Sequence, residues 1–274
     1  MPAPVDNPVA EQLVRAARDL ADEVDRLSFA PPVAYVYNPL RHAWPLHEQY
    51  LRRFGGPIGS TSGTDTGKTT LLLGMNPGPW GMAQTGVPFG EVAAVRDWMQ
   101  LDAPHQGLDP AAVAATDLHP KRPLLGLACP RSEVSGRRLW SLMMDRFGEP
   151  DAFFADHFVL NYCPLVFMEA SARNLTPDKL PVAERRPLLE ACDRHLRRVV
   201  QILRPRHVVG VGKFALKQAT QALNGLASET PSETARSLRF SSILHPSPAS
   251  PAANRDWATQ ATQQLCSAGV WPGL

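Results

Sequence analysis

Residues 70–91 read TLLLGMNPGPWGMAQTGVPFGE, and this stretch decides the fold. It begins with an unalternating apolar run at 70–75 and continues into a loop of Gly, Pro and polar residues. A short apolar run that ends in turn residues is typical of a parallel strand buried on both faces. A long ordered loop is usually functional, and glycines let its backbone approach a ligand closely. The stretch therefore predicts a strand and a ligand-binding loop, with a structural loop that buries Phe89 as the alternative.

Three similar apolar runs follow, and helical patterns separate them. The runs lie at 157–163, 207–211 and 240–244, and a shorter strand is expected at 33–37. Helices are expected at 44–54, 91–101, 134–146, 183–203, 213–223 and 254–267, with Asn254 as the N-cap of the last one. Alternation of this kind predicts an α/β fold, a three-layer α/β/α sandwich around a mostly parallel four-stranded sheet.

The length and composition favour one large domain. The chain has 274 residues, 44% of them hydrophobic, which is enough for one full core. Residues 8–27 show the spacing of an amphipathic helix, so we expect a helical extension at 1–30 before a single domain at 31–274. Residues 55–69 are rich in Gly, Ser and Thr and indicate an exposed loop.

Charge, cysteine spacing and hydropathy exclude several classes of function. The net charge is only +2, so bulk charge does not argue for a nucleic-acid partner. The four cysteines stand apart, without zinc, redox-pair or iron–sulfur spacing, and reduced thiols are expected. We find neither a signal peptide nor an apolar run of membrane-spanning length. The expected location is intracellular: the cytoplasm or nucleoid, or the nucleus of a eukaryote.

The strand ends indicate where a ligand binds. In sheets of this kind ligands bind beyond the carboxyl ends of the strands. Four loops lie there, and the last one places His245 before two X-Pro units that favour extended backbone. From position alone, His245 is as much a candidate catalyst as a structural residue.

Two of these loops carry a family resemblance. The loop at 74–91 resembles the first signature of the single-strand-selective monofunctional uracil-DNA glycosylases, in the uracil-DNA glycosylase superfamily, and HPSP at 245–248 with Asn254 resembles the second. The segments NYCPLVFM at 161–168 and SEVSG at 132–136 also match, so the resemblance runs from about Tyr35 to Trp257. It implies that residues 31–274 are one catalytic domain of this type.

The resemblance implies a base excision repair enzyme. We expect it to flip uracil, and also 5-hydroxymethyluracil, out of single-stranded or mispaired DNA and to hydrolyse the N-glycosidic bond, leaving an abasic site. It implies DNA as the partner, no membrane, a monomer, and no metal or cofactor. Neither signature loop contains a lysine, so a Schiff base followed by strand cleavage is not expected.

The resemblance also assigns roles to residues. Asn76 positions the attacking water and His245 donates to uracil O2, where negative charge develops; these are the expected catalytic residues. Asn161 reads the N3 and O4 edge of the base, and Phe89 stacks on it. The other expected substrate-binding residues are Met75, Gly78 and Met82, the last two around the 5-position. Those expected to bind DNA are Pro246, Ser247, Pro248, Ala249, Ser250 and Asn254.

The chain departs from the family pattern in two places. Ala249 stands where the family often has a long basic side chain that wedges into the base stack. A short side chain there favours single-stranded or mispaired uracil, because extrusion from a paired duplex costs a few kcal/mol. Trp80 stands where the family usually has a smaller aromatic residue.

Several alternatives remain open at this stage. One is excision of xanthine or hypoxanthine on the same fold, and another is a non-catalytic module that binds single-stranded nucleic acid through Phe89. GTDTGKT at 63–69 imitates a P-loop but has the wrong glycine spacing and precedes a strand. The arginines within 183–207 are either a solvated helix face or a DNA contact, and Lys213 either meets a phosphate or caps a helix. Packing roles are expected for Trp44, Trp98, Trp140 and Trp271.

Overall fold

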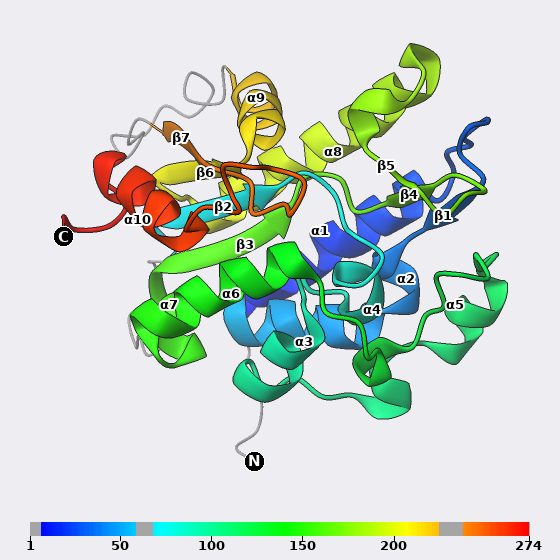
Figure 1. The fold of residues 1–274 in the computed structure, drawn as a ribbon, viewed down its shortest axis with the longest axis horizontal. Helices are drawn as coiled ribbons and strands as arrows, with labels where there is room; N and C mark the ends of the chain where they lie inside the picture. Colours follow the sequence, from blue (N-terminus) through cyan, green and yellow to red (C-terminus); the bar gives the residue numbers. More distant parts are fainter. Residues whose placement is uncertain (1–6, 59–67, 225–237, 274) are drawn as a thin grey trace.

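The predicted apolar runs form one parallel sheet. The computed structural model describes residues 7–58, 68–224 and 238–273 (Figure 1). Its central sheet has the strand order β3-β2-β6-β7 and is parallel throughout. The strands are β2 (Thr70–Gly74), β3 (His157–Asn161), β6 (His207–Val211) and β7 (Arg239–Ile243). The α/β prediction is confirmed, and the turns that end β2, β3 and β7 begin one or two residues earlier than expected.

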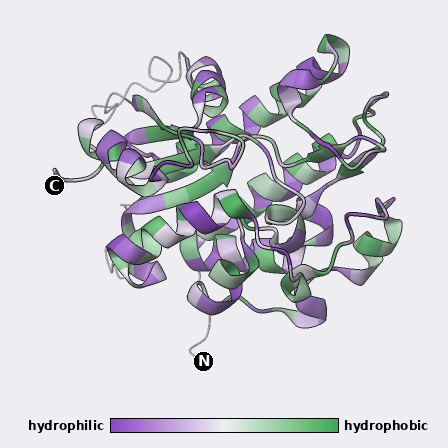
Figure 2. Cartoon of the chain, in the orientation of Figure 1, coloured by the Kyte–Doolittle hydropathy of each residue, from purple (hydrophilic) through white to green (hydrophobic). Residues whose placement is uncertain are grey.

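Helices cover both faces of this sheet and bury β2, β3 and β6, whereas β7 at the sheet edge is mostly exposed or half-buried, contrary to the expectation from its apolar run. One layer contains α6 (Val134–Phe147), α7 (Pro150–Asp156) and α10 (Trp257–Ser267), in front in Figure 1. The other contains α1 (Pro8–Val24), α3 (Trp44–Phe54), α8 (Val182–Leu203) and α9 (Lys213–Ala222). Figure 2 shows the hydrophobic colouring concentrated in the strands between the layers, as burial on two faces requires.

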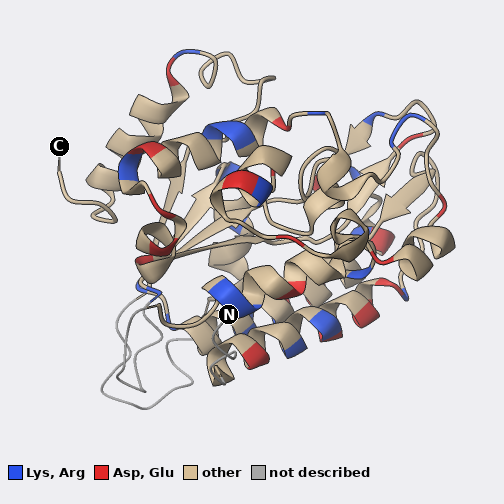
Figure 3. Ribbon diagram, turned by 90° about the horizontal axis from the view of Figure 1, so that it is seen from below, with Lys and Arg blue, Asp and Glu red and all other residues tan. Residues whose placement is uncertain are grey.

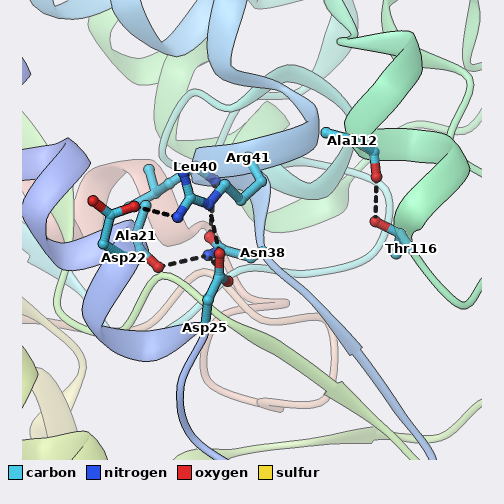
Figure 4. A network of polar contacts seen from close by, with 8 residues as sticks. All are labelled: Ala21, Asp22, Asp25, Asn38, Leu40, Arg41, Ala112 and Thr116. Atoms are coloured by element: carbon cyan, nitrogen blue, oxygen red, sulfur yellow. Dashed lines mark hydrogen bonds and ion pairs between the residues drawn. The ribbon is translucent and has the colours of Figure 1, made fainter.

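Helix α1 is part of the main core. Asn7 caps it by accepting from the Val9 and Ala10 amides, and its apolar side packs against α3 and α8. Figure 4 shows how its far end is held: Asn38 donates to Asp25 over 2.6 Å, and Arg41 pairs with Asp22 and Asp25. Asn38 also caps the short helix α2 (Pro39–His42).

Part of the basic character of α8 is balanced by acids on α1. Arg194 pairs with Glu23, and Arg198 pairs with Asp19. Acidic and basic residues alternate along the helices at the lower edge of Figure 3. For these two arginines the contacts favour a role in helix packing.

A second, small sheet lies beside the first. It is antiparallel, with the order β1-β4-β5: β1 (Tyr35–Tyr37), β4 (Val166–Met168) and β5 (Asn174–Leu175). The strand expected at 33–37 is β1, whereas β4 and β5 were not expected. Two or three residues are too few for a recognisable period, and these strands exist through pairing with distant segments.

Two predicted helices differ in detail. Helix α10 begins at Trp257 and is capped by Asp256, which accepts from the Thr259 amide, so the prediction of Asn254 as N-cap was wrong. Asn254 instead uses its side chain within the preceding loop. The helix expected at 91–101 contains a π-helical turn, Ala94–Trp98, in which the Met99 amide donates to the Ala94 carbonyl over 2.9 Å.

Four shorter helical segments were not expected. They are α4 (Met82–Thr85), α5 (Pro110–Ala115) and the 3-10 turns Pro104–Gly107 and Gly126–Ala128. The helices α2 and α7 and the 3-10 turn Pro177–Lys179 were not expected either. The tryptophans expected to pack do so, with Trp44, Trp140 and Trp271 buried and Trp98 partly buried against the same core.

The segment that imitates a P-loop ends in a buried lysine. Residues 63–67 lie outside the described residues, but Lys68 is described. Its ammonium donates to the Phe154 carbonyl, and burial lowers its pKa to about 7. It precedes β2, at the end of the sheet opposite the carboxyl ends, so it is placed for packing and not for a phosphate there.

All four cysteines are free thiols. No helix in the described ranges is long and apolar enough to span a membrane. Within the same ranges, no group of three or more His, Cys, Asp or Glu side chains is arranged to hold a metal ion.

Candidate functional site

A cavity of about 600 Å³ opens at the carboxyl ends of β2 and β3. This volume is within the usual range for small-molecule sites. The cavity gathers residues from both signature loops and from β3, far apart in the sequence. The expected site residues that line it are Met75, Asn76, Gly78, Met82, Phe89, Asn161, His245, Ser247, Pro248, Ala249 and Ser250. Pro246 and Asn254 are not among its lining residues.

The sheet register explains how Asn161 reaches the cavity. Asn161 ends β3 directly beside Gly74, the last residue of β2. A Cβ atom on Gly74 would lie 2.1 Å from Asn161 Oδ1 and 2.6 Å from the Phe89 ring. Asn161 is 5% exposed, and its Nδ2 donates to the Met82 thioether over 3.2 Å. Because thioethers accept weakly, this donor is held in place but is available to a better acceptor.

Phe89 occupies a strained backbone position against the cavity. Its φ is +53°, in the left-handed region that aromatic residues rarely adopt. The Trp140 indole donates to its carbonyl over 3.0 Å, and Gly136 passes so close that a Cβ would lie 2.0 Å from that oxygen. Strain of this kind persists only where the surroundings impose it, so α6 fixes the orientation of the ring.

His245 presents a neutral ring with a defined tautomer. The Ser247 amide donates to Nδ1 over 3.1 Å, so the proton of the neutral ring resides on Nε2. Burial lowers the pKa of His245 below its ordinary value, which keeps the ring neutral at pH 7. Gly212 supports this placement, since a Cβ there would lie 3.2 Å from His245 Cβ. The ring therefore offers an uncharged donor.

Asn76 is oriented by its own loop and by the segment after β3. Its Nδ2 donates to the Leu165 carbonyl over 3.2 Å and to the Pro77 carbonyl over 3.4 Å. With the NH₂ group engaged in this way, Oδ1 is the atom left to accept a hydrogen bond from water. An amide has no basic lone pair of useful pKa, so the side chain orients water without deprotonating it.

An arginine on α6 holds the loop that carries His245. Arg138 donates to the Pro246 carbonyl over 3.1 Å and to Asn254 Oδ1 over 2.8 Å. Asn254 in turn donates to the Pro248 carbonyl over 2.9 Å. Both ends of the Asn254 amide are thus engaged within the protein, and the loop is clamped at two points.

Four polar residues that were given no role from the sequence also line the cavity. Glu133 caps α6 by accepting from the Ser135 and Gly136 amides, and burial raises its pKa. Its position just before the helix expected at 134–146 could have identified Glu133 as the N-cap of that helix. The others are Ser135, Asn174 and Thr176, of which the last two belong to or follow β5, where no periodic pattern exists.

The comparisons with known proteins agree with this geometry. The family model described as the Uracil DNA glycosylase superfamily matches residues 62–266, which includes every cavity-lining residue.

The chain belongs to the uracil-DNA glycosylase superfamily. Within it, the chain is 44% identical to the single-strand selective monofunctional uracil-DNA glycosylases of Rattus norvegicus and Mus musculus. The matches cover 100% of this chain and 94% and 89% of those proteins. The family predicted from the two signature loops is therefore confirmed.

One solved structure shares the fold at low sequence identity. Wild-type SMUG2 of Pedobacter heparinus superposes with a TM-score of 0.62 at 16% identity, covering 94% of this chain and 96% of that one. At this identity the likeness concerns the fold alone, and it agrees with the α/β arrangement described above.

Proposed function

We propose that this protein is a monofunctional uracil-DNA glycosylase, which hydrolyses the bond between uracil N1 and the deoxyribose C1′ and leaves an abasic site. One observation carries the proposal: a neutral His245 donor, the Asn76 Oδ1 acceptor and the Asn161 amide line one cavity. These are the groups that the reaction needs on the leaving base, the attacking water and the edge of the base.

The leaving base receives its stabilisation from His245. As the C1′–N1 bond breaks, its electron pair moves to the base, and negative charge develops on O2. A preorganised donor aimed at developing charge is typically worth 10²–10³-fold in rate, about 2.7–4 kcal/mol. The Nε2 proton supplies that hydrogen bond without being transferred, and the ring stays neutral.

The water completes the reaction at the sugar. Asn76 Oδ1 accepts a hydrogen bond from the water and directs the water oxygen at C1′, where positive charge develops. The oxygen bonds C1′, and its proton leaves through solvent to the uracil anion. Because Asn76 is not a base, we expect slower chemistry than a carboxylate there would give, by up to about 10²–10⁴-fold.

Recognition of the base follows from Asn161 and Phe89. The Asn161 amide pairs one donor with O4 and one acceptor with N3–H, and O4 replaces the weaker Met82 sulfur as acceptor. Cytosine presents a donor at the 4-position and an acceptor at N3, which leaves buried groups unpaired and is strongly rejected. Phe89 stacks on the base, a contact worth about 1–3 kcal/mol.

The cavity wall at the 5-position admits a larger base. Gly78 has no side chain, and a Cβ there would meet nothing nearer than Glu133 at 3.9 Å. We propose that the space between Gly78, Met82 and Glu133 accommodates the hydroxymethyl group of 5-hydroxymethyluracil, with a polar wall for its hydroxyl.

We further propose that a monomer prefers uracil in single-stranded or mispaired DNA. Ala249 lies at the cavity rim, where a short side chain fills little of the space that a flipped base leaves in a duplex. Flipping a base out of paired DNA costs a few kcal/mol, and a short side chain offsets little of this cost, so paired uracil is the least favourable substrate.

Single-turnover excision tests the function directly. Excess protein is mixed with a single-stranded oligonucleotide carrying one uracil, and samples are resolved with and without alkali. We expect strand breaks only after alkali, and slower excision when uracil is paired with adenine. The proposal fails if uracil gives no alkali-labile sites, or if xanthine or hypoxanthine is excised faster than uracil.

A further inference from the structure

Two arginines from a different part of the chain lie close to the Trp80 ring. The guanidinium carbon of Arg122 is 5.1 Å from the Trp80 ring centroid, and that of Arg131 is 5.3 Å from it. Both distances are in the range of cation–π attraction. The excision mechanism uses none of the three side chains, yet one indole brings two positive charges together.

A buried glutamine holds this cluster beside the cavity. Gln84 is completely buried, and its Nε2 donates to the Pro79 and Pro123 carbonyls over 2.9 and 3.0 Å. Its Oε1 accepts from the Leu125 amide over 2.8 Å. Pro79 directly precedes Trp80, and Pro123 directly follows Arg122. The Gln84 amide therefore holds together the two segments that carry the indole and this guanidinium.

The positive charge of the cluster is not neutralised by the protein. Arg122 donates to the Lys121 and Ala172 carbonyls, which position its guanidinium but carry no formal charge. Among the described residues, neither Arg122 nor Arg131 forms an ion pair with a carboxylate. This differs from Arg194 and Arg198, which pair with acids of α1. Two guanidinium groups beside one indole, neither of them ion-paired, attract an anion.

Two segments of the chain connect the cluster to the wall of the cavity. Trp80 directly follows Pro79, which lines the cavity, and Arg131 lies two residues before Glu133, which also lines it. A nucleic-acid strand with its uracil in the cavity must carry its neighbouring phosphates away across the rim. Guanidinium groups suit phosphate oxygens because they offer several N–H donors in one plane.

We propose that Arg122 and Arg131, assembled by Trp80, bind a phosphate of the single-stranded DNA that flanks the excised nucleotide. This rests on the function proposed above. The subsite holds the strand beside a flipped base by electrostatics, in a protein whose Ala249 offers little support to a duplex. It requires no base contact, so it is independent of sequence.

The test measures binding separately from chemistry. The probe is a single-stranded oligonucleotide with one 2′-fluoro-arabinouridine, a uracil nucleotide that resists cleavage, and its Kd is measured over a range of salt. We expect Arg131→Gln to weaken binding about tenfold and to reduce the slope of log Kd against log salt by about 0.7, the value for one phosphate on a single strand. Arg186→Gln is the matched control, because Arg186 is exposed and already paired with Glu190.

A second measurement identifies the phosphate. Methylphosphonate linkages, which remove one charge each, are placed singly on either side of the uracil analogue. At one position the neutral linkage should weaken binding to the wild-type protein but not to the Arg122→Gln/Arg131→Gln variant. Trp80→Phe, with a smaller ring, should give an intermediate Kd.

The outcomes separate this inference from the function on which it rests. The subsite is overturned if Arg131→Gln leaves the slope of log Kd against log salt unchanged. It is also overturned if every methylphosphonate position weakens binding equally in the wild-type protein and in the double variant. Both results would stand even if the wild-type protein excises uracil normally. Failure of the wild-type protein to excise uracil overturns the proposed function instead. The variants should retain the wild-type single-turnover rate at saturating protein, since the subsite does not contact the reacting atoms.

Discussion

Replacement of Gly74 by alanine should disable the recognition of uracil from a position that does not contact the base. The new Cβ would lie 2.1 Å from Asn161 Oδ1 and 2.6 Å from the Phe89 ring, well inside van der Waals contact at about 3.4 Å. One or both side chains must therefore move by about 1 Å. A misplacement of that size in a catalytic arrangement can cost about 10²-fold in rate, or roughly 2.7 kcal/mol.

The assay is single-turnover excision of uracil from a single strand, with the free energy of unfolding measured in parallel. We expect Gly74→Ala to lower kcat/KM about 100-fold and stability by about 1–3 kcal/mol, the usual cost of overpacking. Gly273→Ala is the matched control, because a Cβ at Gly273 meets nothing within 4 Å. A folded Gly74→Ala protein with activity within about threefold of wild type would refute the argument that this glycine makes room for both side chains.

Three further predictions follow from the site and the core. His245→Ala should lower the single-turnover rate about 10²–10³-fold while the Kd for a non-cleavable uracil strand changes little, and an equal loss in Kd would contradict its role on the leaving base. Arg138→Lys keeps the charge but loses the two-point clamp, so the rate should fall about tenfold with stability nearly unchanged, whereas the exposed neighbour variant Arg137→Lys should match wild type. Below pH 6.5 the free energy of unfolding should fall by up to about 1.4 kcal/mol per pH unit for each buried histidine, because the unfolded chain binds protons that the folded one resists down to a pKa of about 4. Urea unfolding at several pH values checks this, and a pH-independent result would contradict it; the histidines concerned are His42, His47, His157 and His195.

The strands of the central sheet were predictable because their signal is local. In runs such as TLLLG and HVVGV every residue is buried, because both faces of the strand are covered. A run of consecutive apolar residues in the sequence therefore indicates such a strand. The position of the site followed from the same signal, since ligands bind at the carboxyl ends of such strands. Asn76 and His245 each lie two residues after one of these ends, Gly74 and Ile243.

What the sequence did not predict depends on contacts between distant residues. Arg138 clamps a loop more than a hundred positions away, and nothing in its helix distinguishes it from Arg137. The π-helical turn at Ala94–Trp98 and the cap at Asp256 depend on backbone geometry that no residue pattern specified. The strands β4 and β5 form only by pairing with segments brought from elsewhere.

The packing of α1 against α8 also determines when the protein can fold. Glu23 and Arg194 are 171 positions apart, and the Ala16 carbonyl and the His195 ring that meet are 179 positions apart. A ribosome that adds about 5–20 residues per second needs roughly 10–30 s to bridge that separation. During that interval α3 is already available to pack against α1, but the part of α1 that contacts α8 has no partner on the nascent chain, and closure of such a long loop is intrinsically slow. The contacts between α1 and α8 can therefore form only after nearly all of the chain between these two helices has been made.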